Sequence, residues 1–318
     1  MGTYPMKSLT RLLLLAVTLA TPLALSAKIT RNVDKTFTVQ PGGHFKAVTQ
    51  GGDIIIKTAD TPEVRIRAKQ VIRASTEQEA DEILAKLTLT LEQNGNDVVA
   101  ESKYEKRASG SWFGNWPPVS VSFEVTVPRN FNLNLNTSGG DIAVASLTGN
   151  VHARTSGGDL RFARIDGDID AGTSGGDITL NEGTARAKLT TSGGDIHVDR
   201  AGGPTEVSTS GGDIELNSVA NLISATTSGG DVHAVITGPL TQDTLLSTSG
   251  GEVDVRVATG TGFQLDASTS GGDVHADGLT ITIERGGSGK SRLSGSVNGG
   301  GPRLKLRSSG GDVTIRAS

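Results

Sequence analysis

One column of side chains in this sequence has the residue types that bind transition metals. A Thr-Ser-Gly-Gly-Asp/Glu string recurs along the chain, and two residues beyond its acidic position five successive repeats carry His197, Glu215, His233, Asp254 and His275. If the repeats stack in parallel, these side chains are outward neighbours, and imidazole with carboxylate at such spacing could hold zinc or a similar divalent cation. The alternative is a solvated strip in which alternating residue types avoid like-charge contacts. We expect no other cofactor.

The segment at residues 104–118 is a second candidate site because it holds both tryptophans of the chain. Trp112, Phe113 and Trp116 could form a stacking platform for a glycan or a tip that enters a membrane interface. The structural alternative, which the composition favours slightly, is a lid over the apolar end of the core.

Two motifs that suggest catalysis lack the context that catalysis requires. Residues 172–176 match the G-x-S-x-G pattern of hydrolases, but they are one copy of a repeated corner and no helix follows them. Residues 286–291 resemble the end of a phosphate loop, but Glu284 stands where the first glycine is needed. We therefore predict no catalytic residues and a protein that is not an enzyme.

Composition excludes further classes of function. The chain has 30 basic and 34 acidic residues, a formal net charge of -4, which is unsuited to binding nucleic acid through counterion release. It has no cysteine, which removes disulfides, thiolate metal sites and cysteine catalysis. Residues 1–27 are typical of a secretory signal, with Lys7 and Arg11 before an apolar run that Pro22 interrupts. We expect an exported mature chain without a membrane span, most simply periplasmic, with the cell surface or secretion as alternatives.

The recurring string predicts the fold. Its copies begin at Thr137, Thr155, Thr173, Thr191, Thr209, Thr227, Thr248 and Thr269, in steps of 18 and then 21 residues, with variants at Thr49 and Ser308. The gap before Ser308 suggests one worn repeat near residues 299–301. Fixed periods of this length indicate stacked supersecondary units.

Apolar residues alternate with polar ones on both sides of each corner, as in Ile178 and Leu180 after it and Ile169 and Ala171 before it. Period-two alternation means strands with one buried face. We predict an all-β fold, a parallel β-solenoid (β-helix) of about ten short coils. Glycine pairs would supply positive φ angles at the corners. Threonine and serine hydroxyls would bond from coil to coil, and the corner carboxylates would accept glycine amides, a calcium stack being the weaker alternative.

The organisation has three parts: the signal at 1–27, a first coil and capping region at 28–136, and the repeat solenoid at 137–318. In the capping region, Ser75 with Gln78 predicts the start of one helix, which presents Ala80, Ile83, Leu84 and Leu87 on one face. Asn94–Gly95 predicts a hairpin turn.

The repeated T-S-G-G-D-I motif, preceded by a helix and by the V-x-V-P-R segment at residues 125–129, resembles a bacterial family of putative adhesins with β-strand repeats. That family carries a head GIN-type domain of otherwise unknown function. The resemblance covers about residues 35–318 and implies a parallel β-solenoid, an envelope location and no catalytic residues.

Together these features predict a non-catalytic exported β-solenoid that presents a rigid binding surface to an envelope or surface component, protein or glycan. A second hypothesis is an envelope-stress or sensing accessory that binds a membrane-protein partner. The third is a β-helix enzyme acting on polysaccharide, for which the short repeats leave little loop to wall a groove.

Overall fold

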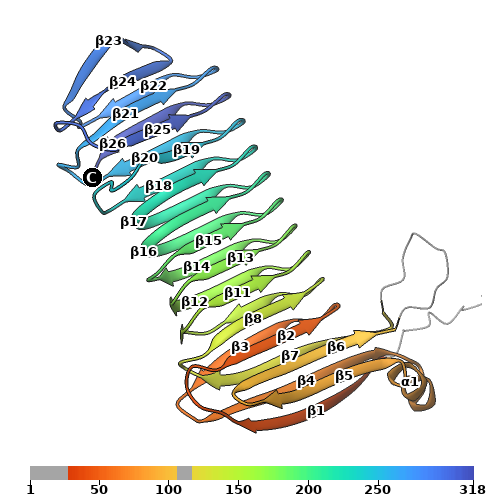
Figure 1. Ribbon diagram of the computed structural model, residues 1–318. Coiled ribbons are helices and arrows are strands. Elements are labelled where there is room, and N and C mark those ends of the chain that lie inside the picture. The colour runs from red at the N-terminus through yellow and green to blue at the C-terminus, as the bar shows by residue number, and fades with distance from the viewer. Residues whose placement is uncertain (1–27, 106–116) are drawn as a thin grey trace, which may run out of the picture.

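Alternating apolar residues give the chain strands with one buried face, and these strands pair side by side. The computed structural model describes residues 28–105 and 117–318, apart from the side chains of 284–286. Within those residues the strands form one 26-stranded sheet that curls around an elongated apolar core (Figure 1). The predicted signal at residues 1–27 lies outside the described part of the chain.

The strands that run into each Thr-Ser-Gly-Gly corner form a parallel ladder, named here the inbound ladder. Neighbouring strands are offset by one repeat, so that Leu133 lies beside Val151 and Val151 beside Ile169. In spatial order its strands are β2 (His44–Thr49), β8 (Asn132–Thr137), β11 (Val151–Arg154), β13 (Ile169–Gly172), β15 (Ala187–Thr190), the second halves of β16 (Ile196–Ser208) and β17 (Ile214–Thr226), β19 (Thr244–Ser247), β25 (Arg303–Arg307) and β21 (Phe263–Ser268).

The strands that leave the corners form a second parallel ladder, named here the outbound ladder. In spatial order its strands are β3 (Ile54–Ala59), β9 (Ile142–Val144), β12 (Leu160–Asp166), β14 (Ile178–Gly183), the first halves of β16 and β17, β18 (Val232–Ile236), β20 (Val253–Val257), β26 (Val313–Ala317) and β22 (Val274–Asp277). The short β10 (Leu147–Thr148) pairs with the end of β12. The two ladders enclose the core between them.

The predicted inward register is confirmed over most of the stack. Ile178, Ile196 and Ile214 are 0% exposed, as expected for residues that directly follow the corner acid. At the far end Val274 and Ala276 are only half-buried, because in the described part of the chain β22 pairs with β26 alone. The alternation before each corner also predicts Ile223 as an inward residue. In β17 the pairing shifts by one residue at a bulge, so Leu222 is buried instead and Ile223 is half-buried.

Five strands and the helix of the described residues before Asn130 widen one end of the stack into a foot (Figure 1). Here β1 (Lys28–Thr38), β4 (Glu63–Arg73) and β7 (Val119–Pro128) pair antiparallel, and β7 joins the outbound ladder at β3. The hairpin of β5 (Leu87–Asn94) and β6 (Asp97–Tyr104) joins the inbound ladder at β2. The predicted hairpin is confirmed, but its turn lies one residue later than predicted: Asn94 pairs with Asp97, which leaves Gly95 and Asn96 at the tip.

The predicted helix is confirmed as α1 (Glu77–Leu84), but its start differs from the prediction. Thr76, not Ser75, is the N-cap and accepts a hydrogen bond from the Glu79 amide at 3.2 Å. Glu79, not Gln78, reaches back to the helix start, where it accepts the amide of Ser75, the residue before the cap, at 2.8 Å. Leu87 begins β5 instead of continuing the helical face.

The opposite end of the stack is closed by a second antiparallel hairpin. β23 (Ile281–Gly289) pairs with β24 (Arg292–Val297), and β24 pairs antiparallel with β21. The worn repeat predicted near residues 299–301 is therefore not a coil but the crossing between β24 and β25. An all-β chain with one helix in its described part is confirmed, while the sheet is mixed, parallel in the repeats and antiparallel at both ends.

The predicted role of the corner glycines is wrong. No corner glycine of the described Thr-Ser-Gly-Gly strings has a positive φ; such angles occur elsewhere, for example at Gly95 and Gly149. The second glycine is required for a different reason. A Cβ on Gly176 would lie 2.1 Å from the Gly158 carbonyl oxygen of the neighbouring repeat, whereas a Cβ on Gly175 would meet nothing closer than 3.6 Å. Backbones approach so closely at each corner that a side chain has no room.

Candidate functional site

The threonine of each corner holds two repeats together. The Thr155 hydroxyl donates to the Gly140 carbonyl of the preceding repeat at 2.9 Å and accepts the Gly158 amide of its own corner at 3.3 Å. The same pair of bonds recurs at Thr173, Thr191, Thr209 and Thr227. The predicted coil-to-coil hydroxyl bonding is therefore confirmed, and its acceptor is a glycine carbonyl.

The corner aspartates form a second ladder of hydrogen bonds. The Asp159 amide donates to Asp141 Oδ1 at 2.8 Å, and the Asp177 amide donates to Asp159 Oδ1 at 2.9 Å. The corner carboxylates were predicted to accept glycine amides. Instead, they accept the backbone amide of the acidic residue at the next corner. Because each carboxylate completes a backbone hydrogen bond, the recurrence of Thr-Ser-Gly-Gly-Asp is explained by folding, without a ligand.

The His/carboxylate column lies on the outer face of the outbound ladder. His197, Glu215, His233 and Asp254 are consecutive neighbours across β16, β17, β18 and β20, as the sequence predicts. His275 is not the next member, because Thr314 of β26 lies between Asp254 and His275. The order of repeats along the sequence therefore predicted the wrong neighbour for Asp254, namely His275 in place of Thr314.

His197 is held between two carboxylates. Its Nδ1 lies 3.0 Å from Glu215 Oε2 and its Nε2 lies 2.9 Å from Asp199 Oδ1. Burial alone would lower the pKa of His197, but the hydrogen bonds to Asp199 and Glu215 outweigh it and the pKa is raised. The hydrogen bond from His197 lowers the pKa of Asp199, with help from Asn217. Both ring nitrogens therefore face carboxylate oxygens, an arrangement that favours the protonated form of His197.

This arrangement predicts a pH dependence of stability. A histidine whose pKa is raised on folding stabilises the protein below its ordinary pKa of about 6.5, and that contribution is lost as the pH rises through the raised value. We expect His197→Gln to lower the melting temperature at pH 5.5 and to change it little at pH 9. Because the side chain is partly exposed, the difference is below about 1 kcal/mol. An equal loss at both pH values, measured by thermal unfolding, would show that the charge of His197 plays no part.

Among the residues that the structure describes, no three histidine or carboxylate side chains converge in the way a metal ion requires. The cation site at His197, Glu215, His233, Asp254 and His275 stays a prediction. The aromatic site cannot be placed, because Trp112, Phe113 and Trp116 lie outside the described residues.

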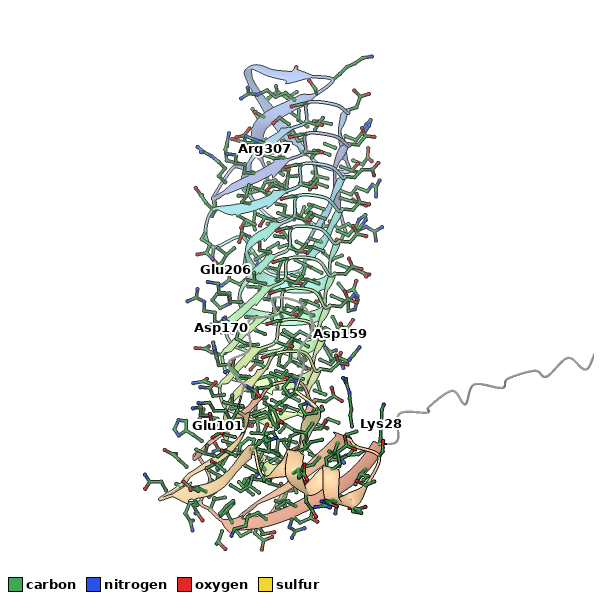
Figure 2. All side chains as sticks on the ribbon, turned by 90° about the vertical axis from the view of Figure 1, so that its right-hand side faces the viewer. Lys28, Glu101, Asp159, Asp170, Glu206 and Arg307 are labelled. Carbon is green, nitrogen blue, oxygen red and sulfur yellow. The ribbon has the colours of Figure 1, made fainter. Side chains whose placement is uncertain are left out.

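A hollow in the described residues lies on the other ladder. It has a volume of about 510 Å³ and crosses the outer face of β8, β11, β13 and β15, beside β2. Its polar lining includes His44, Asn134, His152, Asp170, Arg186 and Lys188. We name this hollow the inbound groove. In Figure 2, Asp170 and Glu206 point outward on one side of the stack, and Asp159 on the other.

Several charged side chains of the inbound groove have ion-pair or hydrogen-bond partners on neighbouring strands, and Asp170 has two of them. Arg154 Nη2 donates to Asp170 Oδ1 at 2.7 Å, and His152 Nδ1 lies 3.4 Å from Asp170 Oδ2. Burial raises the pKa of Asp170, but the hydrogen bond from Arg154 and the nearby positive charges outweigh it, so the net effect is a lowered pKa. At the foot end, His44 Nδ1 lies 3.1 Å from Asp97 Oδ1. The groove therefore offers a fixed array of amides, imidazoles and both signs of charge.

Sequence reasoning missed this groove although its signal was available. Asn134, His152, Asp170, Lys188 and Glu206 are register neighbours across five inbound strands and recur every 18 residues in the sequence. They occupy the position between the two buried residues that precede each corner. The corresponding outbound column drew attention because it contains three of the five histidines.

Comparison with known proteins identifies a family. The family model described as Toastrack DUF4097 matches residues 47–316. Among curated proteins none matches the chain. The match does not extend to the narrower head GIN-type designation, which stays a prediction.

Several solved structures are similar over most of their length. A putative adhesin from Bacteroides fragilis NCTC 9343 has 14% identity and a TM-score of 0.43, with 91% of this chain and 97% of that chain covered. A putative adhesin from Parabacteroides merdae ATCC 43184 has 11% identity and a TM-score of 0.42, with 91% and 96% covered. A putative lipid binding protein from Parabacteroides distasonis ATCC 8503 has 13% identity and a TM-score of 0.39, with 90% and 96% covered. At such identities and scores, function has to be argued from the chain's own residues. Across the described ranges no helix is long and apolar enough to cross a bilayer.

Proposed function

The chain belongs to the Toastrack DUF4097 family, and from this premise and the geometry of its ladders we propose that it is a non-catalytic, exported β-solenoid of about ten coils whose inbound groove binds a polar polymer of the cell envelope. The first coil and capping region occupy residues 28–136 and the repeat solenoid occupies 137–318. The predicted signal at 1–27 supports export, with the periplasm as the simplest location.

The single observation that carries the proposal is the inbound groove itself. The lining side chains stand on neighbouring strands about 4.8 Å apart, so donors and acceptors repeat regularly along the stack. An extended polymer with hydroxyl and amide groups can make the same kind of contact at successive strands. A glycan has these groups and carries no requirement for a strongly charged surface, which fits the mixed charges of Asp170, Arg186 and Lys188.

Rigidity supports binding at this face. The strands beneath the groove bury Leu135, Ala153, Ala171 and Leu189 at 0–1% exposure, so their outward side chains stand on a packed core. A surface that is already ordered loses little conformational entropy on binding. In the described residues one apolar cluster fills the space between the two ladders, which favours binding at the outer face over catalysis in the interior.

Substitutions in the groove test the proposal. We expect Asn134→Ala with Lys188→Ala to weaken binding to solubilised envelope glycans about thirtyfold. Two lost polar contacts of about 1 kcal/mol each sum to about 2 kcal/mol, and about 1.4 kcal/mol corresponds to a tenfold change. The measurement is a binding titration of the exported chain, with folding checked by circular dichroism.

The matched control is Thr179→Ala with His233→Ala, which removes two outward side chains from the outbound ladder. It should bind as the unchanged protein does. Equal loss in both double variants, or loss in the control alone, would contradict the assignment to the inbound groove. Binding to envelope proteins but not to glycans would favour the sensing hypothesis.

A further inference from the structure

The last coil of the chain does not lie at the end of the stack. In chain order the repeat of β19 and β20 is followed by the repeat of β21 and β22. In space, the repeat of β25 and β26 lies between those two repeats (Figure 1). On the inbound ladder β25 pairs with β19 on one side and with β21 on the other. On the outbound ladder β26 pairs with β20 and with β22. After Val257 the chain thus leaves a gap one repeat wide in the stack, and residues 303–317 later fill that gap.

The skipped position is completed on both sides by the inserted coil. The Val253 amide donates to the Asp312 carbonyl at 3.0 Å, and the Val313 amide donates to the Asp273 carbonyl at 3.0 Å. At the corner, the Ser308 hydroxyl donates to the Gly251 carbonyl and the Thr269 hydroxyl to the Gly311 carbonyl, both at 2.7 Å. Without the coil, strand edges would be unpaired on two facing sides.

Packing and charge add to the fit of the inserted coil. Leu304, Leu306, Val313 and Ile315 are 0% exposed and fill the core between the neighbouring repeats. Arg307 Nη2 lies 2.5 Å from Asp266 Oδ2, which belongs to the strand on one side. Every one of these contacts depends on the sequence of residues 303–317 and none depends on the covalent connection to β24.

The connection itself is a sharp crossing of five residues, 298–302. β24 and β25 lie on opposite sides of β21, so the chain must cross the start of β21 between them. Asn298, Gly299, Gly300 and Gly301 all have positive φ, and a Cβ on Gly301 would lie 2.7 Å from the Gly262 carbonyl oxygen. The three glycines adopt positive φ without steric cost and so allow the tight crossing, which a side chain at residue 301 would strain.

We propose that the gap between β19–β20 and β21–β22 is a strand-accepting interaction surface that takes residues 303–317 of a second copy of this chain in place of its own. The exchanged coil makes the same contacts in either arrangement, so the two forms differ only in the crossing and in the entropy of association. Exchange is established during folding, when the gap is open, and increases with protein concentration. The proposal is independent of the function of the inbound groove.

A pair of single-cysteine chains tests the exchange, since the protein has no cysteine of its own. His275 and Thr314 are register neighbours on adjacent parallel strands, at a spacing of about 4.8 Å that a disulfide can span. Chains carrying His275→Cys and chains carrying Thr314→Cys are refolded together at high concentration and oxidised. We expect a disulfide-linked heterodimer, and none when the two chains are refolded separately and then mixed.

Two controls keep the result decisive. A single chain with both substitutions should form an internal disulfide, which shows that the geometry allows the bond. Sedimentation of the unsubstituted protein after concentrated refolding should show a dimer, and Gly301→Ala should increase its fraction severalfold by straining the closed crossing. Monomer alone in sedimentation together with no linked heterodimer would overturn the proposal.

Discussion

Replacement of Gly176 by alanine is expected to destabilise the protein by more than about 3 kcal/mol, beyond the usual range for overpacking a core. The added methyl group would lie 2.1 Å from the Gly158 carbonyl oxygen and 2.4 Å from its carbonyl carbon, and both atoms belong to the backbone of the adjacent repeat. Backbone held between two ladders cannot move aside without breaking hydrogen bonds in both. Chemical denaturation of the two proteins measures the difference.

Gly175→Ala is the matched control, one residue away in the same corner. Its methyl group would meet no atom closer than 3.6 Å, which is ordinary contact. We expect its unfolding free energy to lie within about 0.5 kcal/mol of the unchanged protein, as for surface substitutions in general. Equal stability of the Gly176→Ala and Gly175→Ala variants would contradict the conclusion that the neighbouring backbone leaves no room for a side chain at residue 176.

Ile178→Asp is expected to cost about 3–5 kcal/mol, the range for an uncompensated buried charge. Ile178 is 0% exposed and lies between Leu160 and Ile196 of the adjacent repeats, where no cation can reach an introduced carboxylate. Thermal unfolding and circular dichroism measure the loss.

Thr179→Asp provides the control for added charge. Thr179 faces outward between Arg161 and His197, so the same carboxylate there lies beside basic groups in water. Its melting temperature should change little. An Ile178→Asp variant that melts with the unchanged protein would disprove the inward register.

The inward register could be predicted because a strand with one buried face has a period of two, and each corner fixes where that period begins. Ile178 and Ile214 follow directly from the position of the corner acid. The bulge at Leu222 could not be predicted, since Leu222 and Ile223 are both apolar and only pairing with β16 decides between them.

The sequence predicted where the corners lie, but it did not predict why they need glycine. Glycine pairs suggest positive φ in most turns, whereas Gly176 is required by the backbone of a repeat 18 residues away. A single sequence gives no measure of how closely two segments approach. The same limit applies to the corner carboxylates: that of Asp159 accepts the Asp177 amide only because neighbouring repeats are offset by 18 residues.

The repeat pattern could not predict the spatial order of the strands at the end of the stack. Residues 303–317 have the alternation and corner of any other coil, so the pattern places them last, after β22. Only the pairing of Thr314 with both Asp254 and His275 shows that they are inserted. For the same reason the outbound column of histidines and carboxylates was predicted correctly as far as Asp254 and wrongly beyond it.

Modification of the five histidines by diethyl pyrocarbonate, with and without solubilised envelope glycan, tests the central claim most directly. His44 and His152 line the inbound groove, whereas His197, His233 and His275 lie on the outbound ladder. All five are measured in one sample by mass spectrometry, so the outbound histidines are internal controls. Binding in the inbound groove predicts that glycan slows modification of His44 and His152 and leaves the other three unchanged. Protection of the outbound histidines, or binding of glycan with no protection of His44 and His152, would contradict it.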